Sequence, residues 1–357
     1  MKRAYGCLIA AAVFIGLSVS GGHKRMLPAT ISQEEQSLET PLTREFFAMN
    51  TMIQVEVYDG GKEEALDEAA ELIGRLDRLW SVTDENSEVY AMNHHPGVPV
   101  PVSGETGELA RFSLYMAQET KGAFNPAVYP LVKAWGFTTG QYRIPEDGEL
   151  GELLSHSHYQ EVKLNNGTIT LPKQMEIDFG AVGKGYAGDL AAQVLKSHGV
   201  RSAILNLGGN VSLIGRNPDK SLWKVGIRSP YGEGTMGTLE AEDCHIITSG
   251  GYERYFTGED GRVYWHILDP ETGKPADSGI ISATIVGREG KMCDALSTAM
   301  FVMGRGRAEE YWRTHEGFEM ILVTDDNEIY ITEGLEGRFR LSEASRGIPV
   351  FVIRREV

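Results

Sequence analysis

The 357-residue sequence has little cysteine, few cations for its length and no apolar run of the length usual for a membrane-spanning helix. Only 3 cysteines occur, and 34 Lys and Arg stand against 50 Asp and Glu, which gives a formal net charge of −16. The shortage of basic residues argues against nucleic-acid binding, which needs clustered Lys and Arg to displace counterions. It also argues against docking on anionic lipid through a basic face.

The N-terminus has the layout of a secretory signal. Lys2 and Arg3 precede an apolar run of 13 residues, Cys7 to Val19, and small residues follow at 18–21. An uncleaved N-terminal anchor is the alternative interpretation. In both cases we expect the folded body to be extracytoplasmic, either secreted or tethered to the cytoplasmic membrane. The predicted organisation is a signal peptide or anchor at 1–21, a polar tether at 22–42 and one catalytic domain at 43–357.

Only Cys244 and Cys293 lie in the predicted body of the chain. An oxidising compartment would allow a disulfide to form between them. The favoured interpretation is that both are small, buried hydrophobic side chains. No CxxC or CxxH pair occurs, so a zinc site of the usual spacing is unsupported.

Hydrophobic periodicity predicts an α+β protein. Residues 45–58 alternate as a half-buried strand from Met52 onward, and helical spacing predicts helices at 62–80, 107–119, 184–198, 292–302 and 308–314. Strands are predicted at 202–207, 211–214, 223–227, 245–248, 263–267 and 281–286, and a hairpin at 319–323 and 328–331. Residues 140–158 are polar, which predicts a connecting excursion, a segment that leaves the main fold between two subdomains. Clustered strands with intervening helices favour a mixed, largely antiparallel sheet with flanking helices.

Five segments carry residues suited to chemistry, and the first of them is 177–186. Here a strand is followed by a glycine-rich turn and a helix with Lys184 in its first turn. Backbone N–H groups at a helix start and a nearby ammonium group both attract phosphate. The spacing is not that of a Walker A loop, since Gly180 lies three residues before Gly183 and Gly185 replaces the Ser or Thr. A purely structural turn is an equally good interpretation.

The other four segments are also ambiguous when each is taken singly. Asn206–Asn210 contains a Gly-Gly pair typical of a hairpin turn. Thr248–Arg254 is a second glycine-containing stretch, and His266–Gly273 places a histidine before an Asp-Pro turn. In Cys293–Ala299, Asp294 and Thr298 are four residues apart and would share a helix face. Their oxygens are the hard ligands that Mg²⁺ prefers, although Asp294 would also serve as a helix N-cap.

Together with four further motifs, these segments resemble one family, the FAD:protein FMN transferases of the ApbE type. The resemblance runs from about Phe46 to Gly304. The family's Met-Gly-Thr strand, its Ser- and Asn-containing stretch, its Phe-Asp-Pro-Thr segment and its Leu-Val-x-x-Trp-Gly-Phe element have counterparts at 49–51, 81–93, 124–127 and 131–137. The resemblance implies an ApbE-like, T-fold-like architecture.

Five positions depart from the family pattern. Asn50 replaces Gly, Thr83 replaces a frequent Tyr, Asn125 and Ala127 replace Asp and Thr, and Asn210 replaces the Asp after Gly-Gly. All except Asn210 fall where the family surrounds the flavin, so flavin affinity or substrate preference is expected to differ. The metal and phosphate elements are intact, which favours retained catalysis.

The resemblance implies magnesium-dependent transfer of FMN from FAD, the substrate, to a threonine hydroxyl of a target flavoprotein, with release of AMP. The implied Mg²⁺ ligands are Asp294, Thr298 and the main-chain carbonyl of Ala181, and Lys184 would meet the phosphates. The implied FAD site comprises Met49, Thr83, Ala123, Phe124, Asn125, Asp178 and Ile267. His266 is the candidate general base, because a neutral imidazole suits proton removal near pH 7. Asp294 is the second candidate catalytic residue.

The implied partner is an acceptor flavoprotein subunit of a membrane redox complex, with membrane association of this chain through its N-terminus. Two other functions stay open. One is a magnesium-dependent FAD pyrophosphatase that uses water as acceptor, and the other is a non-enzymatic extracytoplasmic FAD-binding protein. A nicotinamide dehydrogenase is disfavoured because no GxGxxG follows a strand.

Overall fold

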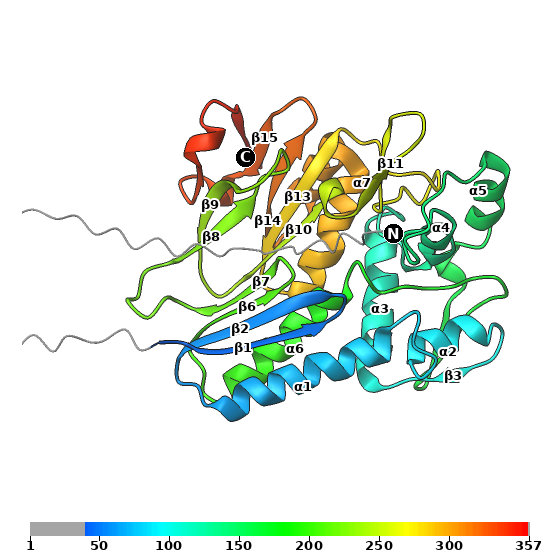
Figure 1. Cartoon of the computed structure of the whole chain (residues 1–357), viewed down its shortest axis with the longest axis horizontal. Helices are drawn as coiled ribbons and strands as arrows, with labels where there is room; N and C mark the ends of the chain where they lie inside the picture. Colours follow the sequence, from blue (N-terminus) through cyan, green and yellow to red (C-terminus); the bar gives the residue numbers. More distant parts are fainter. Residues whose placement is uncertain (1–39, 356–357) are drawn as a thin grey trace, which may run out of the picture.

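The computed structural model describes residues 40–355 (Figure 1). The predicted signal or anchor and almost all of the predicted tether lie outside the described residues. The α-helices are α1 (Glu63–Trp80), α2 (Glu88–His94), α3 (Gly104–Glu119), α4 (Tyr129–Ala134), α5 (Asp147–Leu154), α6 (Gly183–Ser197) and α7 (Gly290–Thr314). Within this range no helix is both long enough and apolar enough to cross a bilayer.

The strands form one large sheet and three small ones. The large sheet has nine strands in the order β1 (Leu42–Ala48), β2 (Thr51–Asp59), β6 (Ser202–Leu207), β7 (Asn210–Gly215), β10 (His245–Gly250), β13 (Ile280–Gly287), β14 (Phe318–Thr324), β15 (Ile329–Thr332) and β17 (Val350–Ile353). Only the β15–β17 pair is parallel. The small sheets are β16 (Phe339–Leu341) with β9 (Thr235–Ala241) and β8 (Trp223–Arg228), β11 (Tyr255–Thr257) with β12 (Val263–Trp265), and β3 (Val100–Pro101) with β5 (Thr168–Thr170) and β4 (Lys163–Asn165).

One face of the large sheet and part of the other are covered, which explains its apolar central strands. Helices α1, α6 and α7 lie on one face and enclose the main core, while β8, β9 and β16 cover part of the other face (Figure 1). A third apolar cluster joins α4 and α5 to the segment after β12 through Leu131, Leu150 and Leu268. The α+β class and the largely antiparallel sheet are confirmed.

The local differences from prediction have local causes. The single strand expected over 45–58 is a hairpin of β1 and β2, because Met49 and Asn50 both adopt positive φ and make a two-residue turn. The polar excursion at 140–158 contains α5. The two helices expected at 292–302 and 308–314 are one element with a break at Gly304, where φ is 74°.

Candidate nucleotide and metal site

The candidate site lies where α6 and α7 cross beside the sheet, and Asp294 joins the two helices. Asp294 is buried on α7, and its Oδ2 accepts a hydrogen bond from the backbone N–H of Gly185 on α6 (2.8 Å). Gly185 is the third residue of α6, so its N–H has no partner within the helix. The residue before α6, Val182, makes no side-chain cap. Asp294 therefore caps the neighbouring helix, which corrects the interpretation of Asp294 as the N-cap of its own helix.

Two neighbours on the sheet complete the surroundings of the Asp294–Thr298 pair. Asn210 is buried at the start of β7, and its Nδ2 donates to Oδ1 of Asp294 (3.1 Å). Ser249, near the end of β10, lies with its hydroxyl 3.2 Å from the hydroxyl of Thr298. The structure thus brings Asp294 and Thr298 together on one face of α7, as predicted, and adds two side chains from the sheet.

The oxygen atoms at this crossing fit a Mg²⁺ ion. In a regular helix the carbonyl of Ala181 would accept from the N–H of Gly185, but Asp294 takes that donor. Within residues 40–355 no other group donates in its place, so the Ala181 carbonyl accepts no hydrogen bond. A free carbonyl, a carboxylate and a hydroxyl are the protein share that Mg²⁺ takes when substrate phosphate and water supply its other ligands. No group of three His, Cys, Asp or Glu residues suited to a metal occurs in the same range, so this site would have a single carboxylate.

Asp178 precedes α6 and Lys184 lies in its first turn, and both interact electrostatically with residues of the segment around β11 and β12. Burial raises the pKa of Asp178, while the N–H of Gly180 and the cations of Arg254 and Lys184 oppose the rise. The backbone N–H of Asp178 donates to the carbonyl of Pro126 (2.9 Å), which links this group to the loop after α3. The same two cations therefore act on both Asp178 and His266 near the start of α6, and positive charge at a helix start attracts a phosphate anion.

His266 follows β12, and one of its ring nitrogens has a defined partner. Its Nδ1 lies 3.1 Å from the carbonyl of Arg254, which can only accept. Nδ1 therefore carries the proton and Nε2 keeps its lone pair in the neutral ring. Burial lowers the pKa of His266 to about 4, and the cations of Arg254 and Lys184 act in the same direction. The imidazole is neutral at pH 7 and can accept a proton at Nε2.

The loop after α3 is held by its own side chains. Asn125 accepts from the N–H of Ala127 (2.9 Å) and donates from Nδ2 to the carbonyl of Ser157 (2.9 Å). An aspartate could not make the second bond, which gives the departure at Asn125 a structural reason. Ala123 and Phe124 are buried. Asn93 bonds both the N–H and the carbonyl of Ile177 and so fixes the residue before Asp178.

The remaining predicted residues are less closely joined to the site. Met49 lies in the β1–β2 turn, at the same end of the strands as the Gly208–Gly209 turn. The two turns are close, since a Cβ on Gly208 would be 2.2 Å from Oγ1 of Thr51. Ile267 is buried in the main core. Thr83 is exposed between α1 and α2, and its hydrogen bonds go to Ser81.

Sequence reasoning did not assign Asn93, Asn210, Ser249 or Arg254 as site residues. All four lie within the motifs that carry the resemblance, and the position after Gly-Gly at Asn210 was the clearest available signal. Cys244 and Cys293 are free thiols, with Cys293 buried and Cys244 half-buried.

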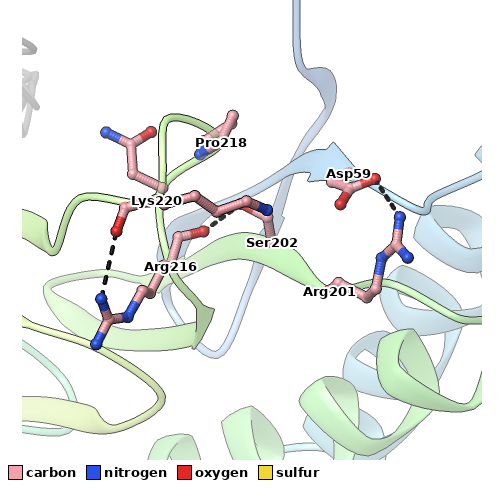
Figure 2. A pocket seen from close by; sticks show the side chains of 7 residues that line it. Asp59, Arg201, Ser202, Arg216, Pro218 and Lys220 are labelled. Carbon is pink, nitrogen blue, oxygen red and sulfur yellow. Dashed lines mark hydrogen bonds and ion pairs between the residues drawn. The ribbon is translucent and has the colours of Figure 1, made fainter.

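Two cavities lie away from this crossing. One of about 230 Å³ is at the opposite end of β6 and β7 (Figure 2). Its arginines are already paired, Arg201 with Asp59 at 2.9 Å and Arg216 with Glu242 at 2.7 Å, so it offers no free cation pair. The other, of about 510 Å³, lies near Cys244, Arg288 and Arg338. Neither contains a residue of the candidate site.

The fold and the site define an α+β protein with phosphate-attracting groups and hard oxygen ligands at a helix crossing. The ApbE family model matches residues 49–322, so the chain belongs to the ApbE family. The FAD:protein FMN transferase of Treponema pallidum is 31% identical over 325 residues, covering 85% of this chain and 90% of the relative. That of Klebsiella pneumoniae is 32% identical over 298 residues, covering 82% and 92%.

Solved structures agree in fold. The ApbE protein of Thermotoga maritima superposes with a TM-score of 0.79 at 32% identity, covering 84% of this chain and all of that one. The flavin transferase ApbE of Vibrio cholerae gives a TM-score of 0.75 at 25% identity, covering 84% and 99%.

Proposed function

We propose that this chain is an FAD:protein FMN transferase that moves FMN from FAD to a threonine hydroxyl of an acceptor protein and releases AMP. The observation that carries the proposal is the juxtaposition at the helix crossing. The Asp294 carboxylate of α7 bonds the first turn of α6, Thr298 lies one turn further along α7, and the cations of Lys184 and Arg254 act on the pKa of His266. The family and its relatives give the coarser assignment, and the threonine target and the need for Mg²⁺ are the finer parts of the proposal.

The reaction exchanges one phosphorus–oxygen bond for another. The acceptor oxygen forms a bond to the phosphorus on the FMN side, and the bond from that phosphorus to the bridging oxygen breaks, so AMP leaves with the bridging oxygen. His266 accepts the hydroxyl proton at Nε2. Its low pKa would rise when the pyrophosphate anion binds nearby, because a negative charge favours the imidazolium. That rise would bring His266 closer to the pKa of an efficient base.

Other groups of the chain bind and orient the substrate. Lys184 and Arg254 neutralise phosphate oxygens, and the start of α6 favours their negative charge. Asp294, Thr298 and the Ala181 carbonyl would hold Mg²⁺, which when bound would neutralise charge on the pyrophosphate. Phe124, Asp178 and the turn at Met49 would place the flavin end of FAD.

The chain is further proposed to act outside the cytoplasm on a flavoprotein subunit of a membrane redox complex. The support is the sequence of residues 1–21, which lies outside the described residues. N-terminal sequencing of the protein recovered from the periplasmic or membrane fraction tests this. A mature end near residue 22 supports the signal peptide, an intact membrane-bound chain supports the anchor, and recovery in the cytosol contradicts both.

The decisive experiment incubates the purified chain with FAD, MgCl₂ and an apo flavoprotein subunit that carries an acceptor threonine. Mass spectrometry should find one FMN added to that threonine and an equal amount of AMP. A matched acceptor with Thr→Val should stay unmodified. Free FMN and AMP without modification would favour the pyrophosphatase, and FAD binding without AMP release would favour the carrier.

A further inference from the structure

Helices α6 and α7 cap each other, and neither is capped by its own chain neighbour. The residue before α7, Glu289, makes no side-chain cap, just as Val182 makes none for α6. Instead, Asp189 of α6 accepts from the N–H groups of Gly290 (2.6 Å, Oδ1) and Lys291 (2.9 Å, Oδ2) at the start of α7. Conversely, Asp294 of α7 accepts a hydrogen bond from the N–H of Gly185 at the start of α6. The two carboxylates thus satisfy donors that each helix start leaves open.

The backbones of α6 and α7 are in close contact at the crossing. A Cβ on Gly185 would lie 2.1 Å from the carbonyl oxygen of Gly290, and a Cβ on Gly290 would lie 2.4 Å from that of Gly185. Glycine at both positions therefore lets the two backbones touch. A shift of α7 along α6 would break both caps together, because both span the same contact.

Asp189 is itself in contact with a buried histidine of the sheet, which in turn bonds a buried serine. Nε2 of His245 on β10 lies 3.1 Å from Oδ1 of Asp189, and Nδ1 of His245 lies 2.8 Å from the hydroxyl of Ser212 on β7. Ser212 and His245 are buried. Burial lowers the pKa of His245 to about 4 and raises that of Asp189 to about 6, so at pH 7 a neutral imidazole packs beside the carboxylate.

We infer that Asp189 is a positioning residue that fixes the start of α7 on α6 and thereby sets the place of the Asp294 carboxylate. Asp294 lies four residues, about one helical turn, beyond Gly290. His245 and Ser212 anchor Asp189 to the same two strands that supply Ser249 and Asn210 to the site. The link from the place of Asp294 to catalysis rests on the proposed function, whereas the link from Asp189 to Asp294 does not.

The test of the link to Asp294 needs no metal, FAD or acceptor. In the full-length chain labelled with ¹⁵N-glycine, amide hydrogen exchange is followed at Gly185 and Gly290 in the wild type and in Asp189→Asn. Asn keeps the volume but offers one acceptor oxygen in place of two. We expect Gly290 and also Gly185, whose N–H is bonded by Asp294 and not by the Asp189 carboxylate, to exchange at least about ten-fold faster.

Ser103→Ala is the matched control. Ser103 caps α3 through the N–H of Thr106, and α3 carries no candidate site residue. It should leave the exchange of Gly185 and Gly290 unchanged. Unchanged exchange at Gly185 in Asp189→Asn would overturn the inference. If that variant does not fold, His245→Ala, which keeps the Asp189 carboxylate but removes the imidazole beside it, should give a smaller acceleration at Gly185, and no acceleration there would overturn the inference too.

A second measurement connects the position to the reaction. In Asp189→Asn the Mg²⁺ concentration for half-maximal AMP release should rise about ten-fold, as is usual when a residue that orients a metal ligand is lost. FAD binding without Mg²⁺, followed by quenching of flavin fluorescence, should stay near the wild-type value. An unchanged Mg²⁺ requirement despite faster Gly185 exchange would overturn the catalytic part of the inference. Wild-type transfer by Asp294→Asn would instead show that the proposed metal role is wrong, while the exchange result stands.

Discussion

The two sides of the candidate site are held in different ways. At the helix crossing, buried side chains bond the backbone of another element, as Asp294 does to Gly185 and Asp189 to Gly290. On the loop side, side chains mainly support loops, as Asn125 does by bonding Ala127 and Ser157. Departures from the family pattern at Asn50, Asn125 and Ala127 lie on the loop side.

This difference shows where substitution is tolerated. A loop that rests on one amide can be held by a different residue type, provided that its backbone groups keep partners. A crossing at which two glycines touch cannot adjust, because interior packing transmits any added volume directly. Asn210 is the exception at the crossing, and there the amide donates a hydrogen bond to Asp294 that an ionised aspartate could not donate.

The largest expected effect is that of Asp294→Ala at the crossing. Transfer should fall by roughly 10⁴-fold, because several kcal/mol of charge stabilisation are lost. The chain should also lose about 0.5–2 kcal/mol of stability, since α6 loses its cap. AMP release and thermal melting are measured on the same preparation. A less stable variant with full activity per folded molecule would contradict the metal role and leave only the cap.

On the loop side, His266→Ala should slow transfer by roughly 10²–10⁴-fold while FAD binding stays near normal, because a positioned base acts on the reacting proton. Single-turnover transfer and flavin fluorescence separate the two effects. His94→Ala, at an exposed histidine on α2, is the control and should transfer normally. A His266 variant with the wild-type rate would make His266 a structural residue.

Thr298→Val should cost less than Asp294→Ala, roughly ten-fold in AMP release at limiting Mg²⁺, because it removes a neutral ligand and keeps the shape. Excess MgCl₂ should restore part of the rate. Thr314→Val at the far end of the same helix should change nothing. Equal losses at low and high Mg²⁺ would argue that Thr298 contributes only its bond to Ser249.

Asn125→Asp tests the loop side through stability. An ionised carboxylate would face the carbonyl of Ser157 without a proton to donate, which should cost about 1–3 kcal/mol in urea unfolding. Asn165→Asp, at an exposed position on β4, should be close to neutral. Full stability of Asn125→Asp would show that the Ser157 contact is dispensable.

The pH dependence compares buried His245 with half-buried His266, one on each side. Burial lowers the pKa of both His245 and His266 from 6.5 to about 4. Between these values the unfolded chain binds more protons than the native chain, so both histidines make stability fall as the pH falls from 6.5 towards 4. Asp189, with its pKa raised to about 6, opposes this below pH 6.

The difference in unfolding free energy between a His266 variant and the wild type gives the contribution of His266 alone. His266→Asn should lose less stability than the wild type between pH 6.5 and pH 4.5, as measured by urea unfolding at each pH. Parallel curves for the two proteins would mean that the pKa of His266 is close to its ordinary value. The acid limb of kcat/KM that belongs to His266 should accordingly lie near pH 4 in the free enzyme.

Much of this site was predictable from the sequence because its signals are local. The period of apolar residues predicted α1, and the break at Gly304 follows from a residue that tolerates positive φ. Asp294 and Thr298 share a face because their spacing is that of a helical turn. The short elements α2, α5, β16 and β17 escaped prediction, since a few residues carry too little periodicity to stand out.

Tertiary structure alone decided which of these local pieces meet. The bond from Asn210 to Asp294 joins residues 84 positions apart, and the cap from Asp189 to Gly290 joins residues 101 positions apart. No local pattern reveals either contact, because a carboxylate in a helix looks the same in sequence whether it faces water or a neighbouring helix. The sequence determined the chemical groups of the site. The packing of α6 against α7 determined that Asp294 would cap one helix from the other, because both helix starts lacked a partner of their own.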